Sequence, residues 1–260
     1  MTQGRLKHFG WGREGEGLTA EEEAAALDRY RRLFKVDRFD EFEPPPLSEI
    51  ELRRPRLAPS AALAPYCASE PYERIAHTYG KSFSDYARGL PGHYDNAPDV
   101  VAYPRSETEV AAILDWAGGA QAAVTPFGGG SSVVGGVEPR LEGTAYKAAI
   151  TLDLRHMNRV LEIDRTSRAA RIEAGVFGPT LEAQLKPQAL TLRHFPQSFE
   201  YSTLGGWIAT RSGGHFATLY THIDDLVESL RVVTPRGLLE TRRLPGSGAG
   251  PSPDLSLIHI

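Results

Sequence analysis

Hydrophobic positions recur with the period of a helix in four segments of this 260-residue chain. Thr19 and Glu22 stand at the spacing of a capping box before the first of these segments. Ser106 and Glu109 repeat that spacing before another, which Gly118 and Gly119 are expected to end. The expected helices cover residues 20–34, 106–117 and 180–186 and, as a broken stretch, 72–90.

Short apolar runs predict strands between these helices. Two pairs of runs are separated by turn residues and predict hairpins, 160–163 with 170–173 and 230–233 with 238–241. Three single strands are expected over 100–103, 122–125 and 149–154. Helices mixed with hairpins predict an α+β fold. The unit from 100 to 125 is a strand, a helix and a strand, and α/β sheets bind ligands at the carboxyl ends of such strands.

The first 94 residues differ in pattern from the rest of the chain. They combine the helix 20–34, which carries Leu27, Tyr30 and Phe34 on one face, with the stiff spacer Pro44–Pro46. The Pro- and Ala-rich residues 48–68 are interpreted as an arm outside the core. We therefore expect a mainly helical and extended N-terminal arm over 1–94, followed by a compact domain.

Composition narrows the class of protein. The apolar fraction of 41% and the charged fraction of 24% are those of a globular chain. A net charge of −4 gives no basic excess, so binding of nucleic acid through a basic surface is not expected. Cys67 is the only cysteine, and no apolar run is long enough to span a membrane, which favours a cytoplasmic location. Association with a membrane and formation of a homodimer are left open.

A loop rich in glycine and serine follows the strand 122–125 directly. From Pro126 to Gly136 it reads PFGGGSSVVGG. Glycine permits positive φ and close approach to the main chain, so successive N–H groups can converge on an anion. The loop is interpreted as a cradle for a pyrophosphate, and an exposed flexible turn is the alternative. It is neither a Walker loop nor a dinucleotide fingerprint, since no Gly-Lys follows and Val133 stands at the third glycine position.

A second polar segment begins about seventy residues after the glycine loop. Between Ser198 and Gly214 it holds six hydroxyl-bearing residues and four glycines, and only Glu200 and Arg211 are charged. Such a segment can present short donors to a polar ligand. A glycine-rich helix that packs closely is the alternative.

The two segments, in this order, resemble the FAD-binding (PCMH-type) domain of the vanillyl-alcohol oxidase / p-cresol methylhydroxylase superfamily. Within that superfamily, the alkyldihydroxyacetonephosphate synthase branch is the most similar. The resemblance is strong over residues 95–243 and loose over 5–94. It is carried by the blocks Asn158-Arg159, Glu173-Ala-Gly-Val176, Phe199-Glu-Tyr-Ser-Thr-Leu-Gly-Gly-Trp207, Thr210-Arg211, Ile223-Asp-Asp-Leu-Val227 and Val232-Val-Thr-Pro-Arg-Gly237, and weakly by Phe9-Gly-Trp-Gly12.

The resemblance implies that FAD binds in an elongated form. Its pyrophosphate would lie on Pro126, Phe127, Gly128, Gly129, Gly130, Ser131 and Ser132. The pyrophosphate and flavin ends would be lined by Gln197, Ser198, Phe199, Glu200, Tyr201, Ser202, Thr203, Thr210, Arg211, Ser212 and Gly213. Covalent members of the superfamily often attach the flavin to a histidine of the first loop. This loop has serines and no histidine, so non-covalent FAD is expected.

The resemblance stops before the end of the family pattern. Family members continue with a further glycine-rich FAD segment and a substrate-cap domain that carries a catalytic tyrosine and clustered histidines. We therefore expect a fragment that is inactive alone, with an incomplete FAD-binding domain over 95–255 and a truncated or non-native end over 256–260. No catalytic residue is assigned, because the substrate-cap domain is expected to be absent.

Two functions of different classes follow. The first is the FAD-binding part of a flavoenzyme that acts on a small-molecule or lipid-like substrate. The resemblance implies either the exchange of an acyl for an alkyl group of the ether-lipid type or the oxidation of an alcohol or 2-hydroxy acid. The alternative is a non-catalytic FAD- or nucleotide-binding module, and a weaker one is an α+β scaffold without flavin.

Four further residues are weighed for chemistry. Arg211 is a candidate for binding FAD or an anionic substrate, and a structural ion pair is the alternative. His194, His215 and His222 are candidates for proton transfer, although a lone histidine is more often packed or exposed. Their spacing forms no metal-ligand pattern, so no metal site is expected.

Overall fold

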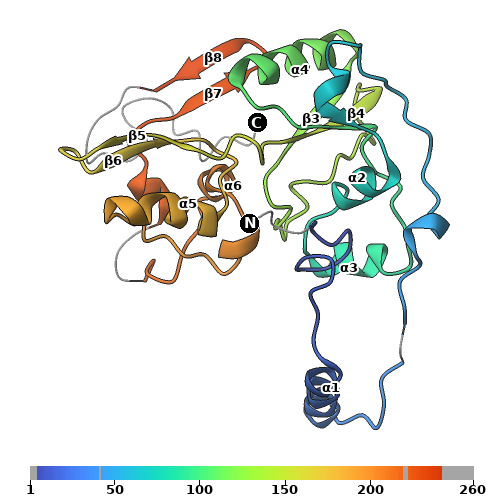
Figure 1. Cartoon of the computed structure of the whole chain (residues 1–260). Helices are drawn as coiled ribbons and strands as arrows, with labels where there is room; N and C mark the ends of the chain where they lie inside the picture. The colour runs from blue at the N-terminus through green and yellow to red at the C-terminus, as the bar shows by residue number, and fades with distance from the viewer. Residues whose placement is uncertain (1–4, 41, 219–221, 242–260) are drawn as a thin grey trace.

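A four-stranded sheet forms the first half of the molecule. The computed structural model describes residues 5–40, 42–218 and 222–241, and Figure 1 shows their arrangement. The strands run in the order β1-β2-β4-β3, and β4 pairs in parallel with β2 on one side and β3 on the other. They are β1 (Cys67–Ala68), β2 (Val100–Ala102), β3 (Ala122–Phe127) and β4 (Ala148–Asp153).

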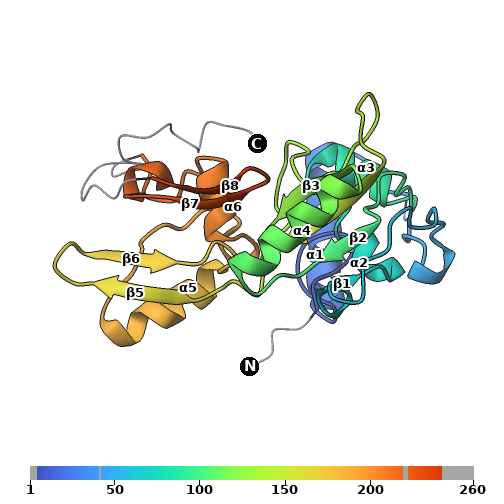
Figure 2. The ribbon, with the colours of Figure 1, turned by 90° about the horizontal axis from the view of Figure 1, so that it is seen from above.

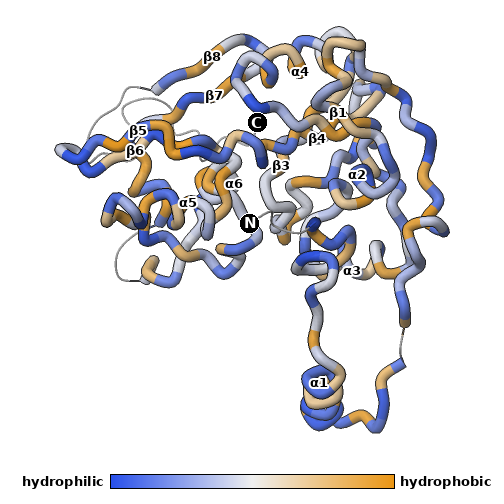
Figure 3. Tube along the Cα trace, viewed as in Figure 1, coloured by the Kyte–Doolittle hydropathy of each residue, from blue (hydrophilic) through white to orange (hydrophobic). Residues whose placement is uncertain are grey.

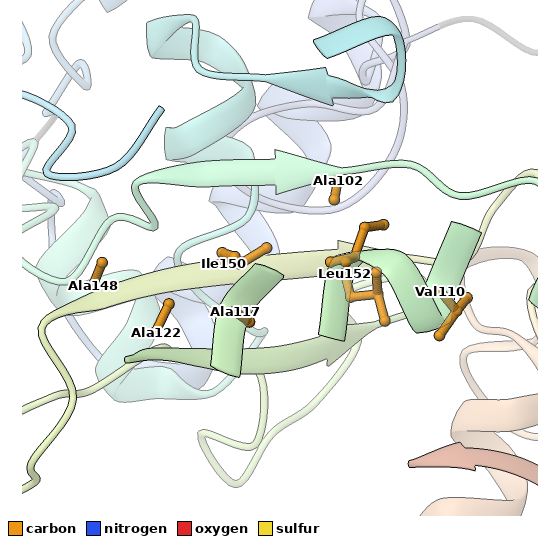
Figure 4. Packing of buried hydrophobic residues seen from close by; sticks show 8 residues of the cluster. Ala102, Val110, Ala117, Ala122, Ala148, Ile150 and Leu152 are labelled. Carbon is orange, nitrogen blue, oxygen red and sulfur yellow. The ribbon is translucent and has the colours of Figure 1, made fainter. Parts of the chain in front are cut away.

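Helix α4 (Glu107–Gly119) connects β2 to β3 and covers one face of this sheet. Figure 4 shows Val110 and Ala117 of α4 facing Ile150 and Leu152 of β4. All six residues of β4 are buried, as expected for a parallel strand with elements on both faces. The expected strand–helix–strand unit is thereby confirmed, and residues 128–136 follow at the carboxyl end of β3.

The ends of α4 differ in detail from the expectation. Ser106 accepts a hydrogen bond from the amide of Glu109 at 3.2 Å, as an N-cap should. The Glu109 carboxylate, however, accepts from the amide of Arg105 at 2.6 Å. The helix also continues through Gly118 and Gly119, because the amide of Ala120 still bonds the carbonyl of Trp116 at 2.9 Å.

The second half contains the two hairpins and two short helices (Figure 2). Both expected hairpins are confirmed by antiparallel pairing, β5 with β6 and β7 with β8. A cluster that includes Val176, Leu181 and Trp207 forms its core. Its elements are β5 (Val160–Asp164), β6 (Ala169–Ile172), α5 (Gly178–Leu185), α6 (Leu204–Ala209), β7 (Arg231–Thr234) and β8 (Gly237–Glu240), with 3-10 turns at Lys186–Gln188, Phe199–Tyr201 and Ile223–Leu226. Two further 3-10 turns, Leu47–Glu49 and Ala64–Tyr66, precede β1.

Part of the expected N-terminal arm belongs to the core. Residues 48–68 were expected outside it, but Leu63 is buried and β1 pairs with β2. The broken helical stretch is confirmed as α2 (Pro71–Ala76) and α3 (Phe83–Gly89), and Ile75 lies in a third core cluster. A strand of two residues has no period of its own, so the sequence pattern could not reveal it.

Helix α1 (Ala20–Phe34) has the expected bounds and the expected capping box at Thr19. It stands apart from both halves in Figure 1, and none of its residues is buried. Figure 3 shows that hydrophobic positions on α1 accompany its charged ones. The apolar face predicted for this helix therefore exists without covering the core of the described chain.

Two expectations concern residues that the structure does not describe. The glycine-rich segment after residue 243 and the end at 256–260 lie outside the described residues. Among the described residues, no helix is long and apolar enough to cross a membrane.

A buried carboxylate joins the N-terminal region to the sheet. Asp99, directly before β2, is fully buried and accepts from the amides of Arg56 and Ala149 at 2.8 Å each. The guanidinium groups of Arg53 and Arg56 also bond it. Burial alone would raise the pKa of Asp99, but these hydrogen bonds outweigh it and hold the pKa at about 2.

We expect Asp99→Asn to lower the free energy of unfolding by about 3 kcal/mol, because it leaves two guanidinium groups without their carboxylate. Since the folded-state pKa is depressed, the contribution of the carboxylate is present above its unfolded pKa and is lost as pH falls toward 2. The difference between the two proteins in urea unfolding should therefore shrink over that acid range. The exposed Asp115→Asn serves as control, and an equal loss in both variants would contradict the assignment.

Candidate functional site

The glycine loop presents a row of backbone donors without acceptors. Within the described residues, none of the N–H groups from Gly128 to Ser132 donates a hydrogen bond. Gly130 is buried and has a φ of +66°, a conformation that glycine adopts without penalty. Buried N–H groups in proteins are almost always bonded, so the unbonded N–H group of the buried Gly130, with those of its half-buried neighbours, indicates a place for an external acceptor.

The structure brings this loop into direct contact with the second polar segment. A Cβ on Gly129 would lie 1.7 Å from the carbonyl oxygen of Tyr201, and one on Gly128 would lie 2.2 Å from the Oγ1 of Thr203. These two glycines are therefore required for contact between the two halves of the molecule. From the sequence these glycines were expected in a pyrophosphate cradle or an exposed flexible turn, and close contact within the protein is a further reason for their lack of a side chain.

Three hydroxyl groups of the second segment, those of Ser202, Thr203 and Thr210, hold the local fold together. Ser202 is buried, accepts from the indole Nε1 of Trp207 at 2.6 Å and donates to the carbonyl of Ser198 at 2.7 Å. Thr203 caps α6 by accepting from the amide of Gly206, and Thr210 donates to the carbonyl of Gly206 at 2.9 Å. The segment thus has a structural role of its own.

The alternative of a closely packed helix also describes α6. A Cβ on Gly205 would lie 2.8 Å from the Cβ of Ala174, and the amide of Gly205 bonds the carbonyl of Ala174 at 2.8 Å. Phe199 stacks on Trp207 with ring centroids 6.1 Å apart. Gln197 and Glu200, in contrast, are exposed and free to meet a ligand.

Residues 210–213 lie at the far end of α6 from Thr203, a separation of about 9 Å for six helical residues. Arg211 has a φ of +49° and its Nε lies 3.0 Å from a carboxylate oxygen of Asp224. The structural ion pair considered for Arg211 is therefore present. Ser212 donates its amide to the carbonyl of Trp207, and Gly213 lies beside the ring of His222.

A buried polar network that the sequence analysis missed lies on the other side of the loop. The imidazole of His77 bonds Asp153, the last residue of β4, at 2.9 Å and the carbonyl of Glu73 at 2.6 Å. Arg155 bonds Asp153 through its Nε at 2.9 Å. Burial would raise the pKa of Asp153, but the bond from His77 and the charge of Arg155 hold it below its usual value. The ring of His77 lies 4.5 Å from that of Phe127.

The N-terminal segment also reaches the surroundings of the glycine loop. Trp11 packs on Tyr201 with ring centroids 5.7 Å apart, and Lys81 donates its amide to the carbonyl of Ser132 at 2.6 Å. The block Phe9-Gly-Trp-Gly12 carried a weak resemblance and was the one signal in the sequence for this contact. His77 and Lys81 had no such signal, because each stands alone in a helical stretch.

The other candidate residues occupy packed or surface positions. His194 is buried against Trp207, and burial lowers its pKa. His215 is exposed. Burial raises the pKa of the Cys67 thiol to about 11, which leaves it unreactive. No cluster of ligating side chains for a metal occurs within the part of the chain that the structure describes.

Several known proteins are similar to this chain in sequence. The alkyldihydroxyacetonephosphate synthase of Dictyostelium discoideum is 45% identical over 177 residues, which cover 68% of this chain and 28% of that protein. The D-2-hydroxyglutarate dehydrogenase of Pantoea ananatis is 36% identical over 176 residues, 64% of this chain and 16% of that protein. The chain thus spans less than a third of the length of these relatives.

Solved structures agree with the sequences. One of an alkyldihydroxyacetonephosphate synthase superimposes with a TM-score of 0.79 at 34% identity, covering 90% of this chain and 49% of that one. The family described as the FAD binding domain matches residues 98–242, from the residue before Asp99 to just beyond β8. That match covers the fold from β2 to β8 and both polar segments, and it shows that the chain belongs to the FAD binding domain family.

Proposed function

We propose that this chain binds the pyrophosphate of FAD on the glycine loop from Pro126 to Ser132. The observation that supports the proposal is the row of N–H groups from Gly128 to Ser132 that have no acceptor among the described residues. Backbone N–H groups can satisfy phosphate charges without a lysine in the loop. The match to the FAD binding domain family supports the same assignment.

The rest of the cofactor would extend along the second segment. Gln197 and Glu200 are exposed beside the residues that contact the loop, and Tyr201 and Thr203 lie against Gly129 and Gly128. The groups proposed to line FAD in this segment are Gln197, Ser198, Phe199, Glu200, Tyr201, Ser202, Thr203, Thr210, Arg211, Ser212 and Gly213. Those whose side chains are bonded internally would act by holding the backbone in place.

We also propose that FAD is held without a covalent bond. The loop offers Ser131 and Ser132 and no histidine. His77 is the histidine next to Phe127, and both of its ring nitrogens are already bonded, one to Asp153 and one to a carbonyl. Neither nitrogen is available to attack a flavin.

For the whole protein, we propose the cofactor half of a flavoenzyme similar to alkyldihydroxyacetonephosphate synthases and FAD-linked oxidoreductases. FAD, when bound, would supply the redox chemistry of its flavin. The residues described here would position it and exclude water, and a small-molecule or lipid-like substrate would be held by other parts of the protein. The single cysteine supports a cytoplasmic location.

The cradle is tested by replacing one glycine of the loop. Gly130→Ala places a Cβ 2.6 Å from the ring of Phe127 at a positive φ, so it should displace the N–H groups beside it. We expect the dissociation constant for FAD, measured by calorimetry, to rise at least tenfold, which is a loss of about 1.4 kcal/mol of binding free energy. The matched control is Gly135→Ala, which has a φ of +73° in the same loop and open space around its Cβ.

The result depends on folded protein, so circular dichroism of both variants accompanies the titration. Riboflavin, which lacks both phosphates, should bind the native protein weakly. Its affinity should differ little between Gly130→Ala and Gly135→Ala. Equal affinity of the two variants for FAD, or equal binding of riboflavin and FAD by the native chain, would contradict the proposed cradle.

The form of attachment is tested by denaturation. After reconstitution with FAD and precipitation with acid, we expect all flavin fluorescence in the supernatant, because no bond holds the cofactor to the unfolded chain. Fluorescence that stays with the polypeptide on a denaturing gel would show covalent attachment and overturn this part of the proposal.

A further inference from the structure

A cavity lies where the N-terminal segment meets the glycine loop. Its volume is about 30 Å³, more than the roughly 10–15 Å³ that one water molecule needs and too small for a flavin or adenine ring. Lys7 and Trp11 line it from the N-terminal segment, Lys81 and Arg155 from the first half, and Gly129 and Gly130 from the glycine loop. These groups come from four separate parts of the chain.

The cavity is cationic and has no acidic wall. No aspartate or glutamate is among the described residues that line it. The nearby carboxylates are already engaged, since Asp85 bonds Arg88 at 2.8 Å and Asp153 bonds His77 and Arg155. Asp153 balances the charge of Arg155. Glu16 lies near Lys7, since both side chains are beside Gly12, and Asp85 acts on Lys81, but neither lysine forms an ion pair with a described carboxylate.

Lys81 is the more unusual of the two. Its ammonium group forms no ion pair or hydrogen bond within the described residues, and it lies 5.9 Å from the centroid of the Trp11 ring, a cation–π contact. Burial lowers the pKa of Lys81 to about 8, and the charge of Asp85 offsets this only in part. A half-buried ammonium without an ion-pair partner is stabilised by a bound anion.

The N-terminal segment is fixed over the cavity by several contacts. Tyr72 donates its hydroxyl to the carbonyl of Leu6, and the guanidinium of Arg5 lies 3.0 Å above the ring of Tyr72. Phe9 packs edge-on against Tyr86 at 5.4 Å. The wall of the cavity that carries Lys7 and Trp11 is therefore an ordered part of the structure.

We propose that this cavity binds a single oxyanion group, a phosphate or carboxylate, between Lys7 and Lys81, beside Gly129 and Gly130 of the glycine loop. The charge of such a group matches two lysines that have no ion-pair partner among the described residues. The N-terminal segment is then part of a binding site that the sequence pattern placed outside the domain. The anion could be one phosphate of FAD or the charged end of a separate small molecule.

The first experiment needs no flavin and does not rest on the proposed function. The full chain, free of FAD, is titrated with inorganic phosphate by calorimetry at constant ionic strength. We expect saturable binding in the millimolar range, weakened at least tenfold by Lys81→Met or Lys7→Met because each removes one cationic partner of the anion. Lys147→Met, an exposed lysine before the amino end of β4, should bind as the native chain does.

The second experiment identifies the source of the anion and rests on FAD binding. The titration is repeated on the chain saturated with FAD. Loss of phosphate binding, with FAD affinity lowered in Lys81→Met, would assign the cavity to a phosphate of the cofactor. Retained phosphate binding would assign it to a separate anionic ligand.

Absence of saturable phosphate binding by the native chain, or equal binding by native protein and a folded Lys81→Met variant, would overturn the inference. FAD binding by the native chain in that case would leave the proposed function intact. Phosphate binding without any FAD binding would support the inference and contradict the proposed function.

Discussion

The parallel pairing of β4 with both β2 and β3 is the constraint on which the rest of the structure depends. β4 is buried along its whole length, so its backbone groups must be bonded within the protein. Most are bonded within the sheet, and the amide of Ala149 donates to the carboxylate of Asp99. Its register with β3, from Ala122 opposite Ala148 to Phe127 opposite Asp153, ends both strands at the same edge. That edge carries the glycine loop on one strand and the Asp153 network on the other.

Close backbone contact across glycines then joins the two halves. A Cβ on Gly129 would collide with Tyr201, and one on Gly128 would collide with Thr203. Gly175 similarly leaves room for the carbonyl of Leu154, 1.7 Å from where its Cβ would lie. The absence of a side chain on these glycines suits contact with a phosphate and also allows close packing of the two halves. The two roles differ in which backbone groups remain unbonded.

That separation distinguishes the two polar segments. Ser202, Thr203 and Thr210 use their hydroxyls to cap and brace α6, whereas the loop from Gly128 to Ser132 leaves its N–H groups without acceptors among the described residues. A rigid, internally bonded segment against a loop with free donors is a preorganised arrangement, because little needs to move when an anion arrives. The cationic cavity beside Gly129 and Gly130 extends the same principle to side chains from the N-terminal segment.

Signals local to the sequence were enough to predict most helices and strands and the family. Capping pairs and helical periods located α1, α4 and α5, turn residues located both hairpins, and the glycine loop and the block before Trp207 indicated FAD, because each of these signals lies within a short stretch of chain. Which groups share a site, in contrast, became visible only in the folded chain. It placed β1 and Leu63 in the core, paired Arg211 with Asp224, and brought Lys7, Trp11, Lys81 and His77 to the glycine loop. These contacts join residues far apart in the chain, and their energy depends on burial and on the position of other charges, which no pattern along the chain records.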